Sequence, residues 1–256
     1  MIEKIRKNAF GSPVLSAICY SLFAVAIFSV PTLFKVADGL ALFLNVLCRT
    51  AATVLALVLA KILGFKLLKF NKITFVGALL LLAGLIVSAN NFPFIGIISG
   101  RVTVNENANV SAYAFYCVMV GISEEAVFRA LVLPLVLRAF PNGKYKTVKA
   151  VSVCALIFSA CHIFNVFSAG VGATALQVGY TFLTGAMFGI VFIITGNMII
   201  PAFLHIVFDI GGLMFSAPFG IARGNMWDTL TVMITAVLGV VVTVVYTVYA
   251  FKNKAD

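Results

Sequence analysis

Six ionisable residues stand inside long apolar runs, and their types and spacing could carry out acid–base chemistry. They are Glu124, Glu125, Arg129, His162, His205 and Asp209, and the chain has no other histidine. A charged side chain at the centre of a bilayer costs about 2.5–3.5 kcal/mol on insertion scales. Because three of the eight acidic residues are placed where they cost most, we expect a functional site; the structural alternative is mutual pairing that only joins helices.

The spacing of the first three residues predicts different roles. Adjacent residues of a helix point about 100° apart, so Glu124 and Glu125 should not face one target equally. Glu125 and Arg129 are four residues apart and share a helical face. We therefore expect Glu125 and Arg129 to form a neutralising pair, which leaves Glu124 to face a cavity as a general base.

The two histidines also have partners at helical spacing. His162 follows Phe158 by four residues, so the two rings should lie side by side. His205 and Asp209 are again four residues apart, which places an imidazole and a carboxylate on one face. Pro201 before them and Gly211-Gly212 after them predict a short, broken helix, a feature that membranes tolerate where it lines a cavity.

The composition excludes a soluble globule. Hydrophobic residues make up 62% of the 256 and charged residues 10%, against about 45–50% and 25% in soluble domains. The net charge of +10 does not indicate a nucleic-acid partner, because the basic residues lie in short gaps between apolar runs and not on one folded face. The five cysteines fall inside apolar runs, so we expect no disulfide framework; they are Cys19, Cys48, Cys117, Cys154 and Cys161.

About eight runs are long enough to cross a bilayer as helices of roughly 20 residues. They are continuously apolar and lack the alternation of barrel strands. We therefore predict an all-α polytopic transmembrane bundle that forms a single integral-membrane domain over residues 1–256, with the polar motifs within 112–213. The predicted spans are 13–34, 41–63, 73–98, 112–137, 150–167, 174–195, 198–215 and 230–251.

The distribution of basic residues predicts the orientation. Thirteen of the 18 lysines and arginines fall on one side of the predicted spans, whereas Lys35, Arg101 and Arg223 fall on the other. The positive-inside rule then places both termini in the cytoplasm. Residues 99–111 form the one sizeable outer loop, and we expect a multi-pass protein of the cell membrane in contact with lipid.

The predicted depths of the polar residues agree. Glu124 lies about 18 Å from the outer start of its span and His162 about 18 Å from its inner start. His205 lies about 10 Å from its inner start. In a core of about 30 Å, all three would meet between the midplane and the cytoplasmic third.

Three further residues carry weaker signals. Arg49, inside the second span, either extends to the interface or meets a substrate group. Gly185 and Gly189 form a GxxxG pair, for which we expect close packing within the bundle and not a dimer face.

Three motifs in this order resemble those of the CAAX-protease and bacteriocin-processing (CPBP, or Abi) family of intramembrane proteases. Glu124 to Arg129 fits EExxxR, Phe158 to His162 fits FxxxH, and His205 to Asp209 fits HxxxN/D. The resemblance covers residues 112–213. It implies endoproteolysis of a membrane-bound peptide or protein, and the short chain looks prokaryotic.

The resemblance also implies roles for these positions. Glu124 and His162 would activate the attacking water, His205 and Asp209 would stabilise the oxyanion, and Glu125 and Arg129 would support the first motif. Better-understood members have Asn at the position of Asp209, and an ionised Asp cannot donate a hydrogen bond to an oxyanion.

Three explanations of this departure stay open. Asp209 is protonated in its apolar surroundings, it orients His205, or it helps to bind a metal. In the last case Glu124, His162, His205 and Asp209 would form a catalytic zinc site, with Glu124 as the base on zinc-bound water; otherwise the enzyme needs no cofactor. The rival functions are a non-catalytic membrane scaffold or regulator, and a small transporter that uses the intramembrane acids.

Overall fold

The computed structural model describes residues 1–34, 36–143, 145–216, 219–224 and 229–252. Lys35, Lys144 and Lys254, which entered the charge count, lie outside the described residues. The N-terminal part comprises α1 (Ile2–Gly11), α2 (Pro13–Ser29), the 3-10 turn η1 (Val30–Leu33), α3 (Asp38–Ile62), α4 (Phe75–Asn90) and α5 (Phe94–Ile98).

The second half carries the predicted site. It comprises β1 (Val102–Val104), α6 (Val110–Glu125), the π-helical turn η2 (Ala126–Val132), α7 (Leu133–Ala139), α8 (Lys146–Cys161), the 3-10 turn η3 (His162–Asn165), α9 (Val166–Ala169), α10 (Val171–Thr195), α11 (Ile199–Gly212), β2 (Ala222–Gly224) and α12 (Thr229–Lys252).

The protein is an all-α polytopic membrane bundle, as predicted. The segments Pro13–Leu33, Gly39–Ile62, Lys146–Ala169 and Val171–Thr195 are long and apolar enough to cross a membrane. Shorter apolar helices cover Phe75–Asn90, Ile199–Gly212 and Met233–Tyr249. The number of eight spans and the orientation of the termini stay predictions.

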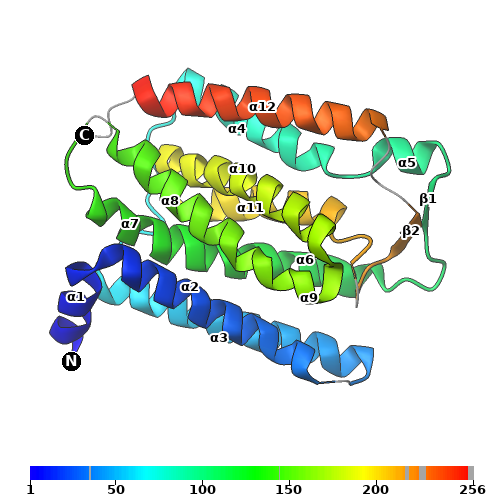
Figure 1. Ribbon diagram of the computed structural model, residues 1–256, viewed down its shortest axis with the longest axis horizontal. Helices are drawn as coiled ribbons and strands as arrows, with labels where there is room; N and C mark the ends of the chain where they lie inside the picture. The colour runs from blue at the N-terminus through cyan, green and yellow to red at the C-terminus, as the bar shows by residue number, and fades with distance from the viewer. Residues whose placement is uncertain (35, 144, 217–218, 225–228, 253–256) are drawn as a thin grey trace.

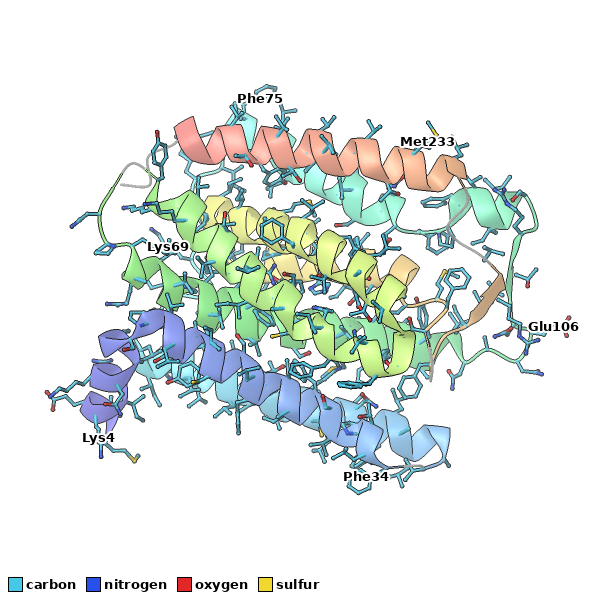
Figure 2. The ribbon with its side chains drawn as sticks, viewed as in Figure 1. Lys4, Phe34, Lys69, Phe75, Glu106 and Met233 are labelled. Carbon is cyan, nitrogen blue, oxygen red and sulfur yellow. The ribbon has the colours of Figure 1, made fainter. Side chains whose placement is uncertain are left out.

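The helices form three layers (Figure 1). α2 and α3 make one outer layer, α4 and α12 make the other, and α6 to α11 lie between them. α1 and the end of α12 lie at one end of the bundle, whereas β1 and β2 lie at the opposite end. Lys4 and Lys69 are at the first end, and Phe34 and Glu106 at the second (Figure 2).

Two predicted segments differ from the structure. The single span 73–98 was wrong: α4 ends at Asn90, and Pro93 separates it from α5, because the residue before a proline is disfavoured in helical conformation. The loop 99–111 contains β1, which pairs antiparallel with β2 in the register Val102↔Gly224, Thr103↔Arg223 and Val104↔Ala222. Strands of three residues are too short to give a periodic signal.

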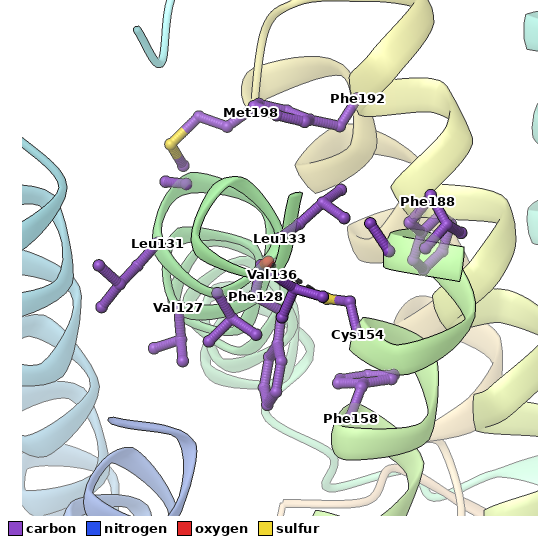
Figure 3. Packing of buried hydrophobic residues seen from close by; sticks show 14 of the residues in the cluster. Val127, Phe128, Leu131, Leu133, Val136, Cys154, Phe158, Phe188, Phe192 and Met198 are labelled. Carbon is purple, nitrogen blue, oxygen red and sulfur yellow. Dashed lines mark hydrogen bonds between the residues drawn. The ribbon is translucent and has the colours of Figure 1, made fainter. Parts of the chain in front are cut away.

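The most deeply buried part of the bundle is η2. Each residue from Ala126 to Val132 is buried, and Val136, Phe158 and Phe188 pack around this turn (Figure 3). Short π-helical segments inside α-helices are frequent at functional sites. Here the widened turn follows directly after Glu124 and Glu125 and includes Arg129.

The GxxxG pair of α10 packs within the bundle, as expected. A Cβ added at Gly185 would lie 2.8 Å from the ring of Phe158, and one at Gly189 would lie 3.2 Å from Val151. The missing side chains therefore let α10 approach α8 closely, which brings the residues that precede His162 towards the centre of the bundle.

Candidate active site

The imidazole of His205 lies between the two glutamates of α6. Its Nδ1 is 2.8 Å from Oε1 of Glu125, and its Nε2 is 3.8 Å from Oε2 of Glu124. Nε2 also lies 3.7 Å from Oδ2 of Asp209 on the same helix. Glu124 and Glu125 point in different directions, as predicted, but they reach opposite nitrogens of one ring.

The predicted ion pair between Glu125 and Arg129 is confirmed. Nη1 of Arg129 donates to Oε1 of Glu125 at 2.8 Å. Nη2 donates to the backbone oxygen of Gly185 at 2.9 Å, and the guanidinium lies over the rings of Phe158 and Phe188 at 5.0 and 5.5 Å. Both side chains of this pair are buried. The oxygen of Glu125 that accepts the hydrogen bond from Arg129 is also the one bonded to His205.

A close contact between α6 and α11 sets the distance between the glutamates and His205. A Cβ at Gly121 would lie 2.7 Å from Cγ1 of Ile206 and 3.1 Å from its backbone nitrogen. Only a residue without a side chain fits there unless α11 moves. The far end of α11 is held by Tyr113, whose hydroxyl donates to the backbone oxygen of Ile210 at 2.7 Å.

Three polar groups surround one small space. Glu124 Oε2 and Asp209 Oδ2 lie 3.8 and 3.7 Å from His205 Nε2, beyond a direct hydrogen bond but within reach of a shared water molecule. Asp209 is 7% exposed, and its Oδ2 has no hydrogen-bond partner among the described residues. A buried acceptor of this kind is typical of a functional site.

His162 lies at the junction between α8 and η3. Its Nδ1 is 2.9 Å from the backbone oxygen of Phe158, and its ring meets the edge of the Phe158 ring at 4.9 Å between centroids. The predicted contact between these rings is thus confirmed, with an edge-on geometry. Phe158 also faces His205 at 6.1 Å, so the two histidines share one aromatic neighbour.

In both histidines, Nδ1 is the ring nitrogen that is hydrogen-bonded to a protein oxygen. A backbone oxygen and a carboxylate accept hydrogen bonds, so Nδ1 of His162 and Nδ1 of His205 act as donors. In a neutral ring the lone pair then belongs to Nε2. The environment therefore selects the tautomer in which Nε2 is available for proton transfer.

Arg49 joins this site from α3, outside the three motifs. Its Nη1 donates to Ser123 Oγ at 3.1 Å and lies 3.7 Å from Oε1 of Glu124. The guanidinium is 4.7 Å from the ring of Phe28 and 5.6 Å from that of Tyr116, so it contacts protein groups inside the bundle, and its two predicted roles, at the interface or towards a substrate, stay predictions. Its position within an apolar span was the only sign of these contacts in the sequence.

A cavity of about 760 Å³ lies at the β1–β2 end of the bundle. Tyr113 lines it, together with residues of the start of α3, the segment 103–109 and the segment 219–223. Tyr113 and Glu124 are 11 residues apart, which places them on one face of α6, about three turns from each other. The cavity therefore borders the same face of α6 as Glu124, about three helical turns away. Nothing in the sequence predicted this cavity.

The structure brings only part of the predicted metal site together, and metal dependence stays a prediction. Among the described residues, no group of three or more His, Cys, Asp or Glu side chains is placed to hold a metal ion. Glu124, His205 and Asp209 are close to one another, and Nδ1 of His205 and of His162 is bonded to a protein oxygen, which leaves Nε2 of each ring as the nitrogen that a metal ion would take. The five cysteines are free thiols.

Comparison with known proteins identifies the segment that carries the site. Residues 106–211 match the family model "Rce1-like", described as type II CAAX prenyl endopeptidase Rce1-like. A relative, CAAX prenyl protease 2 of Arabidopsis thaliana, is 29% identical over 116 residues, which cover 41% of this chain and 36% of the relative. No solved structure matches the chain.

The matched segment includes Glu124, Glu125, Arg129, His162, His205 and Asp209. The chain aligns with about a third of the length of the relative, and α3 with Arg49 lies outside the match to the family model. The segment 106–211 is therefore similar to type II CAAX prenyl endopeptidases of the Rce1-like family, in keeping with the motifs that resemble the CPBP family.

Proposed function

We propose that the protein is an intramembrane endopeptidase that hydrolyses a membrane-associated peptide without a resident metal. The observation that carries the proposal is that oxygens of Glu124 and Asp209 both lie within 3.8 Å of Nε2 of His205. A carboxylate, an imidazole and a second carboxyl group at this separation can hold a water molecule and assist its attack.

Glu124 is the general base in this mechanism. Its carboxylate takes a proton from the water as the oxygen attacks the carbonyl carbon of the scissile amide. The tetrahedral intermediate then collapses, Glu124 returns the proton to the amide nitrogen, and the C–N bond breaks to give a carboxylic acid and an amine, between which the remaining proton is transferred to leave a carboxylate and an ammonium group. His162, which the motif resemblance pairs with Glu124, is proposed to assist the activation of the water.

His205 and Asp209 stabilise the negative charge that develops on the carbonyl oxygen. Glu125 accepts the hydrogen bond of Nδ1, so a protonated His205 presents its Nε2–H to the oxyanion. Asp209 Oδ2, 3.7 Å from Nε2, supplies a second donor when it carries a proton. This assignment reconciles Asp209 with the Asn of better-understood members, because both then donate.

The substrate reaches the site from the β1–β2 end. The cavity there has about 760 Å³, within the usual range of ligand pockets, and it shares a face of α6 with Glu124. The name of the relative, CAAX prenyl protease 2, makes a peptide with a prenylated cysteine the first substrate class to test. We further propose that the protein is a single catalytic unit of a prokaryotic cell membrane with both termini in the cytoplasm.

The test measures cleavage by the purified protein in lipid nanodiscs. A quenched fluorescent peptide with a farnesylated cysteine and three following residues is one probe, and the same peptide without the lipid is the other. We expect the wild type to cleave, and Glu124→Gln to lower kcat by about 10²–10⁴-fold. Glu3→Gln, which changes an exposed glutamate of α1, is the matched control.

A second assay does not depend on the chosen probe. Peptides released from membranes that carry the wild type, Glu124→Gln or His162→Ala are compared by mass spectrometry. Peptides that only the wild type releases support the proposal. Identical peptide profiles for all three proteins, together with no cleavage of either probe, would overturn the protease assignment and favour a non-catalytic scaffold.

A further inference from the structure

We infer that Arg49 is a positioning residue for Glu124, contributed by a helix outside the three sequence motifs. The inference deepens the proposed function and rests on it. Its basis is the contact of one buried guanidinium with two consecutive residues of α6, Ser123 and Glu124.

The charges of the site show why a second guanidinium is needed. Glu124, Glu125 and Asp209 are close together at membrane depth, and Arg129 is bonded to Glu125. Arg49 lies 3.7 Å from Oε1 of Glu124, on the opposite side of this carboxylate from His205, whose Nε2 lies 3.8 Å from Oε2. An uncompensated carboxylate in such surroundings carries a large desolvation cost, and the contact with the Arg49 guanidinium offsets part of this cost.

The hydrogen bonds fix the direction of the guanidinium. Ser123 Oγ donates to the backbone oxygen of Val120 at 3.0 Å, which leaves its oxygen to accept from Nη1 of Arg49 at 3.1 Å. Phe28 and Tyr116 lie against the guanidinium plane. With one hydrogen bond and two aromatic contacts, Arg49 has little freedom to move away from Glu124.

The two oxygens of Glu124 then face different groups. Oε1 is directed to Arg49, and Oε2 is directed to Nε2 of His205. The contact with Arg49 therefore sets the rotation of the carboxylate and leaves Oε2 to take the proton from water. Misplacement of a reacting group by about 1 Å can cost about 10²-fold in rate.

The test compares Arg49→Gln and Arg49→Lys with the wild type in the peptide-cleavage assay. We expect Arg49→Gln to lower kcat by about 10²-fold with little change in KM, because the base is misplaced and the peptide site is not. Arg49→Lys keeps the charge without the planar fork and should recover part of kcat. Ser123→Ala, which removes only the hydrogen bond, should lower kcat less than Arg49→Gln.

Arg138→Gln is the matched control, because Arg138 also lies over two aromatic rings, those of Phe10 and Phe65, but at the other end of the bundle. Its kcat should equal that of the wild type. Thermal unfolding of each variant identifies any loss of fold. If Arg49→Gln does not fold, the kcat values of Arg49→Lys and Ser123→Ala test whether Arg49 positions Glu124.

The outcomes separate this inference from the proposed function. A wild type that cleaves, with full kcat in Arg49→Gln or a defect in KM alone, would overturn the positioning role and leave the protease assignment intact. If Arg49→Lys and Arg49→Gln lose the same fraction of kcat at unchanged thermal stability, the charge of Arg49 has no part in positioning Glu124, and this part of the inference is overturned. A wild type indistinguishable from Glu124→Gln defeats the proposed function itself.

Discussion

Glu125 and His205 are joined by a hydrogen bond of 2.8 Å although they are 80 residues apart in the chain. The same Oε1 atom accepts from Nη1 of Arg129 at 2.8 Å. One buried oxygen therefore neutralises a guanidinium and holds the tautomer of a histidine. Glu125 connects the stability of the bundle to the orientation of the proposed oxyanion donor.

The double role of Glu125 predicts that stability and activity can be separated. Glu125→Met should destabilise the protein by about 3–5 kcal/mol, because it leaves Arg129 charged and unpaired in the core. The double variant Glu125→Met with Arg129→Met should recover much of this loss, since no buried charge remains. It should nevertheless stay inactive, because Nδ1 of His205 has lost its partner.

Denaturant unfolding in detergent measures the first effect, and cleavage of the fluorescent peptide measures the second. Glu3→Met, at an exposed position of α1, serves as the control. A double variant with normal activity would show that the bond from Glu125 to His205 has no part in catalysis.

The position of Asp209 gives a second prediction. If the residue acts as a hydrogen-bond donor, Asp209→Asn supplies a donor in nearly the same place and should keep kcat within about tenfold of the wild type. Asp209→Leu has no donor and should lose about 10²–10³-fold. Steady-state kinetics of both variants checks this, and equal inactivity of the two would mean that the carboxylate itself is required.

The parts of the site that helical periodicity determines were predictable from the sequence. The pairs Glu125–Arg129 and His205–Asp209, and the contact between Phe158 and His162, each follow from a spacing of four residues on one helix. All three are present. The bundle itself was predictable because a run of apolar residues is a strong and local signal.

The contacts between helices were not predictable in the same way. Arg49 meets Glu124, and Glu125 meets His205, only because of how α3 and α11 are rotated and how closely they pack on α6. A single sequence contains no periodic signal for these relations. The widened turn η2 and the short strands β1 and β2 were missed for a similar reason, since each is too short to alter the hydropathy pattern.

Gly121 offers a test of the packing that sets the site. A methyl group there would lie 2.7 Å from Cγ1 of Ile206, so Gly121→Ala should destabilise the protein by about 1–3 kcal/mol through overpacking. It should also lower kcat, because α11 must move and His205 moves with it. The measurements are thermal unfolding and peptide cleavage.

Gly179→Ala is the control for this change, because a Cβ at Gly179 on α10 meets nothing within 4 Å. Replacement of an exposed helical glycine by alanine should stabilise the protein by about 0.5–1 kcal/mol. If Gly121→Ala behaves like Gly179→Ala in both assays, the close approach of α6 and α11 is not what positions His205.

The proposed metal-free mechanism predicts that the activity does not depend on a bound metal. No described group of three His, Cys, Asp or Glu side chains is placed as a ligand set, whereas Nε2 of each histidine stays free for a metal because Nδ1 is the bonded nitrogen. Purified protein should therefore keep its peptide-cleaving activity after prolonged treatment with 1,10-phenanthroline and dialysis. Elemental analysis of the same preparation should find no stoichiometric zinc. Loss of activity that only added zinc restores, together with loss of that zinc in His205→Ala, would instead establish a metal-dependent mechanism with His205 as a ligand.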